Sequence, residues 1–159
     1  MSQSIEIRPH HLLDILRDYG YGIRYQPHEY GHALHIVAEK IMNNLDKEIE
    51  LVVAADDICR PCKHLHADGQ CDDTMQKDRE TISKQAYNDA LDRRLWTYLD
   101  LEGGNRMTVR NFLDHVQSRL DGIESLCAHL GEDPKYRKVG LVEGFKKLGF
   151  GDDLRPPRY

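Results

Sequence analysis

Residues 55–71 read ADDICRPCKHLHADGQC and contain three of the four cysteines of this 159-residue chain. Cys59 and Cys62 are separated by two residues, a spacing that lets two thiolates converge on one metal ion or cluster from a tight turn. Cys71 follows after a polar loop, whereas Cys127 is distant in the sequence. The pattern predicts a cysteine-rich metal or cluster loop at 55–71, around which the rest of the chain is organised.

Four thiolates suit either a tetrahedral zinc ion or a [4Fe–4S] cube, and the spacing prefers neither strongly. Cys127 is the fourth ligand if the fold brings it to the loop, and otherwise it is a small buried apolar residue. His64 or His66 is then the alternative fourth ligand, although a lone histidine is more often a surface residue. If only three cysteines bind a cluster, one iron is open to a small substrate.

The composition favours one soluble globular domain over residues 1–159, since 40% of the residues are hydrophobic and 31% are charged. A net charge of −5 gives no reason to expect nucleic acid or an anionic membrane as a partner. No apolar run approaches the roughly 20 residues that span a bilayer, and the N-terminus lacks the apolar segment of a secretory signal. We therefore expect a cytoplasmic protein whose cysteines stay reduced.

Apolar periodicity predicts a mainly helical α+β domain with at most a small two-stranded sheet. Alternation of apolar and polar residues predicts strands at 4–8 and 48–53, whose pairing would bring the N-terminal histidines near the cysteine loop. The tail at 152–159 is expected to be loose. The predicted helices cover, approximately, residues 9–19, 27–44, 83–101, 108–120 and 123–130, with a last one from residue 134.

Glycines and capping residues set the predicted helix boundaries. Gly20 and Gly22 are expected to end the first helix. Thr108 is expected to cap the N-terminus of the fourth predicted helix, and Asp133, followed by proline, that of the last.

Arg8, His10, His11 and Asp14 crowd one helical turn near the N-terminus. His10 and Asp14 are four residues apart on one face, so the carboxylate is expected to orient the imidazole. The cluster either faces the metal site, as an outer shell or a substrate contact, or is an ordinary polar helix start; the sequence leaves both interpretations open.

A rival site is the H-E-x-x-H match formed by His28, Glu29 and His32. On a helix the two histidines share a face and bind one zinc ion, with Glu29 as general base on a bound water. Ala38 stands where the third histidine of the extended motif would be. An accidental match is plausible in a chain with nine histidines, so the hydrolase is the weaker hypothesis.

The order of R-P-H-H-L-L (residues 8–13), D-I-C-x-x-C (57–62) and Cys71 resembles a small prokaryotic family of unknown function, described as a candidate iron–sulfur-binding family. The resemblance extends from about residue 5 to 127 and implies that all four cysteines ligate a cluster. Many members have a cysteine where this chain has Asp14, and more cysteines near the C-terminus. If the site is altered accordingly, zinc or an oxygen-ligated iron is favoured. The resemblance implies no reaction.

The sequence therefore predicts a [4Fe–4S] cluster-binding protein of unknown reaction, with redox, sensing or small-substrate chemistry as the options and an unidentified redox or protein partner. Its ligands are the four cysteines. A structural Zn²⁺ site in an interaction module is the first alternative, and the H-E-x-x-H zinc hydrolase is the second. Whether the protein is an enzyme stays open.

Overall fold

The structure is a computed structural model that describes residues 3–150, so the predicted loose tail at 152–159 lies outside the described residues. The described chain combines helices with two small sheets, as predicted for an α+β domain. In chain order the elements are β1 (Ile5–Ile7), α1 (Pro9–Gly20), α2 (Leu34–Asn43), β2 (Glu48–Leu51), β3 (Thr74–Lys77), β4 (Glu80–Ser83), α3 (Lys84–Tyr98), β5 (Arg106–Thr108), α4 (Val109–Ser118), α5 (Ile123–Cys127) and α6 (Pro134–Lys147).

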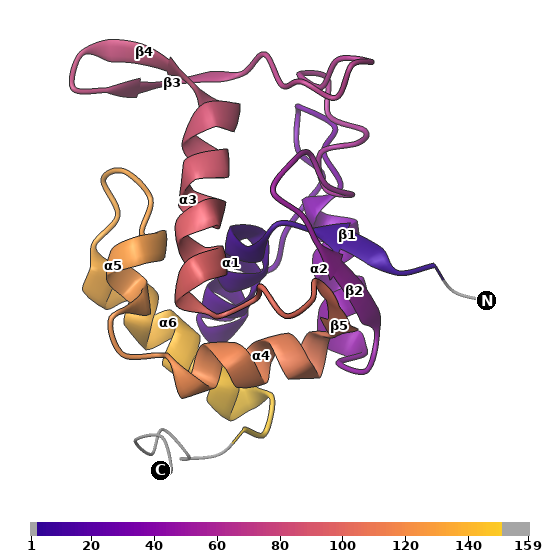
Figure 1. Cartoon of the computed structure of the whole chain (residues 1–159), viewed down its shortest axis with the longest axis vertical. Helices are drawn as coiled ribbons and strands as arrows, with labels where there is room; N and C mark the ends of the chain where they lie inside the picture. Colours follow the sequence, from indigo (N-terminus) through magenta and orange to yellow (C-terminus); the bar gives the residue numbers. More distant parts are fainter. Residues whose placement is uncertain (1–2, 151–159) are drawn as a thin grey trace.

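The predicted pairing of the two N-terminal strands is confirmed. β1 and β2 run parallel, with Ile5 opposite Ile49 and Ile7 opposite Leu51. The sheet is larger than the predicted two strands, because β5 pairs antiparallel with the other edge of β2. A second sheet, the β3–β4 hairpin, was not predicted, and it projects beyond the N-terminal end of α3 (Figure 1).

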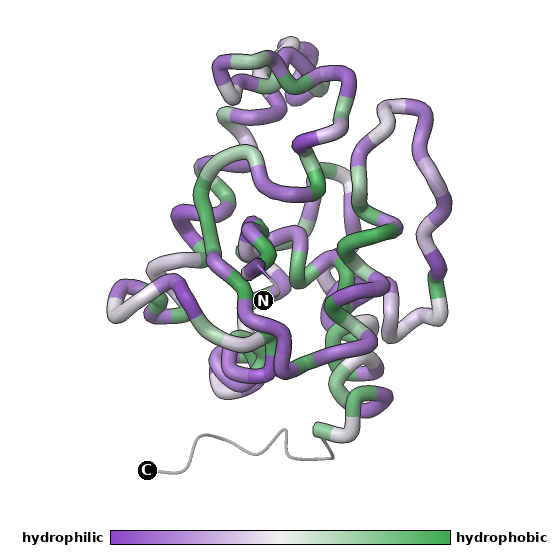
Figure 2. Tube along the Cα trace, turned by 90° about the vertical axis from the view of Figure 1, so that its right-hand side faces the viewer, coloured by the Kyte–Doolittle hydropathy of each residue, from purple (hydrophilic) through white to green (hydrophobic). Residues whose placement is uncertain are grey.

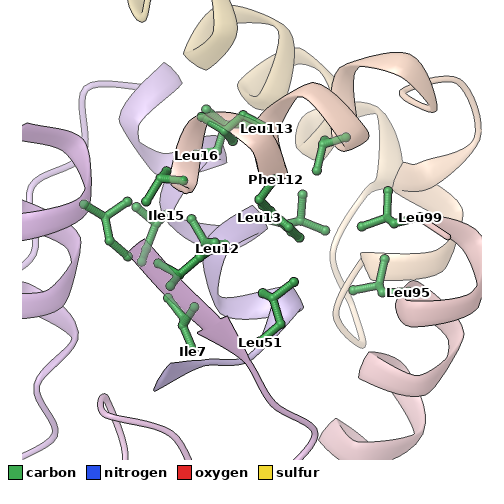
Figure 3. Close-up of a cluster of buried hydrophobic side chains, with 14 of the residues drawn as sticks. Ile7, Leu12, Leu13, Ile15, Leu16, Leu51, Leu95, Leu99, Phe112 and Leu113 are labelled. Carbon is green, nitrogen blue, oxygen red and sulfur yellow. The ribbon is translucent and has the colours of Figure 1, made fainter. Parts of the chain in front are cut away.

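The core gathers around α1, which is apolar on more than one face. Leu12, Leu13 and Leu16 are fully buried, because α1 packs between the sheet and the later helices. Figure 3 shows leucines of α1 beside side chains of β1, β2, α3 and α4. Because α1 is central, the polar residues at its start contact other segments: Arg8 bonds Asp92 of α3, and His11 bonds Asp56.

α1 and α6 cross at very short distance because glycines face one another. A Cβ atom on Gly20 would lie 2.0 Å from the carbonyl oxygen of Gly140, and one on Gly144 would lie 2.5 Å from the carbonyl oxygen of Leu16. Gly20 is thus the last residue of α1 and a packing residue, while the left-handed turn falls on Gly22, whose φ is +71°. The predicted caps of the later helices are confirmed: Thr108 accepts a hydrogen bond at the start of α4 and Asp133 at the start of α6.

Hydrophobic positions recur among hydrophilic ones along the helices (Figure 2). Within residues 3–150, none of the helices combines the length and the apolar character that a bilayer span requires.

The predicted helix at 27–44 is wrong over its first part, because α2 begins only at Leu34. Gly31 has a φ of +77°, which ends any regular helix there. The peptide groups of this segment bond instead to the cysteine loop: the Lys63 amide donates to the Tyr30 carbonyl at 2.8 Å, and the Ala33 amide donates to the Ile58 carbonyl at 2.9 Å. The segment therefore forms an irregular wall beside the loop.

Candidate functional site

The start of the cysteine loop is tied to the start of α1 by one buried carboxylate. Asp56 Oδ2 accepts hydrogen bonds from the Arg8 amide at 2.8 Å and from His11 Nδ1 at 2.6 Å. Its Oδ1 accepts from the amides of Ile58 at 3.1 Å and Cys59 at 3.3 Å. Parallel pairing of β1 with β2 brings these two segments together, as the sequence predicted for the N-terminal histidines and the loop.

Three of the four cysteines share a cavity of about 110 Å³. We call it the cysteine cavity; it is lined by Cys59, Cys62, Cys71 and His64, among others. Cys71 is held in place by α3, since its amide donates to Gln85 Oε1 at 2.6 Å. The loop thus brings together three of the predicted ligands.

These thiols do not form a ready-made metal site. Within residues 3–150, no three His, Cys, Asp or Glu side chains are grouped so that they could hold a metal ion. Burial, followed by the charge of Asp56, raises the pKa of Cys59 to about 12, so its side chain is a neutral thiol. Ligation would require the thiols to turn toward a common point and Cys59 to lose its proton.

Cys127 lies at the end of α5 and is not among the residues that line the cysteine cavity. Its side chain is buried, and its Sγ lies 3.7 Å from Nη1 of Arg137. Burial raises the pKa of this thiol to about 11 although Arg137 lowers it. The structure therefore places the fourth predicted ligand against α6.

Both histidines of the cysteine loop bind one carboxylate. Asp72 contacts His64 Nδ1 at 2.8 Å and His66 Nε2 at 2.7 Å. His64 Nε2 is buried and has no hydrogen-bond partner among the residues that the structure describes. A carboxylate on one ring nitrogen and a free second nitrogen is the usual arrangement of a metal-binding histidine.

A second cavity, of about 320 Å³, adjoins the first. We call it the histidine cavity; its lining includes His10, His11, Asp14 and His129. Both cavities share His11, and Lys84 of α3 also lines both. The N-terminal polar cluster therefore lies beside the cysteines, which was one of its two predicted interpretations.

The predicted pairing of His10 with Asp14 is wrong. His10 Nδ1 lies 2.9 Å from the carboxylate of Asp92 on α3, which also accepts from the His10 amide. Asp14 instead lies 2.9 Å from His129 Nε2 and accepts from Arg137 at 2.6 Å. Residues four apart on a helix are neighbours, but here each side chain turns toward a partner from another helix or loop.

The two adjacent imidazoles have opposite pKa shifts. Burial lowers the pKa of His10, and the neighbouring His11 lowers it further against the opposing effect of Asp92. Burial also lowers the pKa of His11, but the carboxylate of Asp56 outweighs it, so that the pKa is raised overall. The ring that favours the neutral form and the ring that favours the charged form thus lie with their centroids 4.4 Å apart.

The H-E-x-x-H segment lacks the helix on which its zinc geometry depends, since it precedes α2. The rings of His28 and His32 stack at 4.5 Å, and His28 Nδ1 accepts from the Tyr30 amide. Only His32 of the three motif residues lines the two cavities. The structure thus assigns His32 to the cavity wall beside the cysteine loop.

A family model described as a protein of unknown function (DUF1284) matches residues 25–131. The matched part contains all four cysteines but begins after the R-P-H-H-L-L stretch. Comparison with curated proteins and with solved structures gives no match.

Proposed function

The chain belongs to the DUF1284 family of unknown function, and we propose that it binds a [4Fe–4S] cluster in the cysteine cavity through Cys59, Cys62 and Cys71. The observation that supports this proposal is that thiols from separate turns of one loop line the same cavity. Thiolate sulfur is the usual ligand of such clusters. A cluster held by three cysteines supplies one iron that is open to a small substrate, and the histidine cavity adjoins this position.

The test is anaerobic purification followed by iron, sulfide and zinc analysis and an absorbance spectrum. We expect about four iron and four sulfide per chain. Single serine substitutions at Cys59, Cys62 and Cys71 should each remove the absorbance, whereas Cys127→Ala is the matched control and should retain it. Loss of the cluster in a folded Cys127→Ala protein would favour the four-cysteine ligand set that the sequence predicts. A colourless protein with stoichiometric zinc refutes the cluster.

A structural zinc site is the second candidate, and the orphaned Nε2 of His64 favours it. Three cysteines and one histidine are a common ligand set for tetrahedral zinc, with Asp72 orienting the histidine. Asp72→Asn should then weaken zinc binding about 10-fold to 100-fold. Removal of zinc by a chelator should unfold the domain, as followed by circular dichroism.

Both candidates need reduced cysteines, which a reducing compartment such as the cytoplasm maintains. If the cluster transfers electrons, the partner is a redox protein; if it is structural, no redox partner is required. A reversible one-electron signal in voltammetry of the purified protein distinguishes an iron–sulfur cluster from a zinc centre, because zinc has no redox chemistry.

A further inference from the structure

The histidine cavity holds a set of reactive groups that the proposed metal centre does not use. Four imidazoles line it, and those of His10, His11 and His129 are each bonded through one ring nitrogen to a carboxylate of another segment. The pairs are His10 Nδ1 with Asp92 at 2.9 Å, His11 Nδ1 with Asp56 at 2.6 Å and His129 Nε2 with Asp14 at 2.9 Å. Within residues 3–150 the opposite nitrogen of each of these rings has no hydrogen-bond partner and can meet a molecule in the cavity.

The carboxylates are themselves held in place. Asp92 accepts from Arg8 Nη1 at 2.9 Å, and Arg8 also pairs with Asp89 at 2.8 Å. Both Arg8 and Asp92 are buried. A buried carboxylate that fixes one nitrogen of an imidazole, and is fixed in turn, is the arrangement that orients a general base.

The rest of the cavity lining mixes the apolar side chains of Leu34, Ile58 and Met75 with hydrogen-bond donors. Lys84 and Asn88, both on α3, add an ammonium and an amide donor to this lining. Lys84 is 47% exposed and pairs with Asp73 at 3.2 Å, a partly solvated pair that a ligand can replace. Asp14, the carboxylate that lines the cavity, is already bonded to Arg137. Such a surface recognises an oxyanion.

We propose that the histidine cavity binds a small substrate that carries a carboxylate or phosphate group, with His10 as the general base. The volume of about 320 Å³ fits a small metabolite. The oxyanion would lie against His11 and Lys84. His10 would accept one proton from an O–H or C–H group of the substrate, and the electron pair of that bond would stay on the substrate beside His11.

The protonation states agree with these roles. The groups that face His10 are Asp92 from α3, His11 and Asp14 from its own helix, and His129 from beyond α5. Their net effect, together with burial, lowers the pKa of His10, so the ring is neutral and able to accept a proton at pH 7. A pair of neighbouring groups with opposite shifts is typical of acid–base sites.

The first experiment measures calorimetric binding of inorganic phosphate and, separately, of malonate to the wild-type protein in two buffers of different ionisation enthalpy. We expect saturable binding of at least one anion, coupled to proton uptake, because an anion beside His10 raises its pKa. The anion that binds more tightly identifies the oxyanion class. Absence of saturable binding of both anions overturns the proposal, and this result does not depend on a variant that must fold.

The second experiment compares variants. His11→Gln and Lys84→Gln should each weaken binding about 10-fold, as expected for loss of one charge-assisted hydrogen bond. His115→Gln on α4 is the matched control, since His115 lines neither cavity, and it should change binding less than about twofold. Equal weakening in all three variants contradicts the proposal. Cys62→Ser should lose the metal centre and keep anion binding, so this variant separates failure of the two proposals.

Discussion

Substitution of Gly20 by alanine tests the close crossing of α1 and α6. The new Cβ would lie 2.0 Å from the Gly140 carbonyl oxygen and 2.7 Å from the Gly144 amide nitrogen. Both are backbone atoms, so no side chain can rotate away and the helices must separate. Overpacking costs about 1–3 kcal/mol, and more when the backbone has to move. Alanine recovers at most about 1 kcal/mol of helix propensity, less at a helix end.

The free-energy cost of overpacking therefore exceeds the gain in helix propensity, and we expect the free energy of unfolding to fall by about 2 kcal/mol. For a chain of this size that corresponds to a decrease in Tm of about 4–8 °C. Urea and thermal denaturation followed by circular dichroism measure both values. Gly103→Ala is the matched control, because a Cβ there meets no atom of residues 3–150 within 4 Å and φ is not positive; it should change stability by less than about 0.5 kcal/mol. A Gly20→Ala protein as stable as the control would refute the close crossing.

Three further perturbations address the site. Arg8→Met leaves the buried carboxylate of Asp92 without its cation and should cost about 3–5 kcal/mol in urea denaturation, since removal of one partner of a buried pair is strongly destabilising. Gly31→Ala forces a side chain into a φ of +77° beside the Pro61 carbonyl and should cost about 1–2 kcal/mol, with weaker metal retention during gel filtration. Acid should destabilise the protein as the pH falls below about 4. Burial raises the pKa of Asp14, but His129 and Arg137 outweigh it, so the pKa of this carboxyl is lowered in the folded state. The stability that the Asp14 carboxylate contributes is therefore present above its unfolded-state pKa and is lost progressively below it. Asp14→Asn should flatten this part of a plot of stability against pH.

Local patterns predicted most elements that depend on neighbouring residues. The alternation around Ile5 and Ile49 located two strands and their pairing, and the capping residues Thr108 and Asp133 located two helix starts. The predicted helix over 27–44 began ahead of its apolar positions, which start only at Leu34; over 27–33, Gly31 and the hydrogen bonds to the cysteine loop override it.

The site was only partly predictable, because its partners are far apart in the chain. Three cysteines were found from their spacing, which a loop can satisfy locally. Asp92 and His129 gave no local signal: one is one of the two acidic residues of α3, the other a single histidine after α5. The neighbour rule for helices paired His10 with Asp14, and only tertiary packing shows that each has another partner.

The burial of Arg8, His10 and Asp92 is itself an argument for function. Removing charges from water costs several kcal/mol for each ion, and a buried pair commonly does no more than recover this cost. The apolar residues around α1 already provide a continuous core that does not need the polar cluster. This polar network contributes little net stability, and its imidazole, that of His10, lines the histidine cavity. Orientation of that imidazole therefore explains the network better than stabilisation of the fold does. Joint replacement of these three residues by apolar ones of similar volume should therefore leave the free energy of unfolding within about 1–2 kcal/mol of the wild-type value, while anion binding is lost.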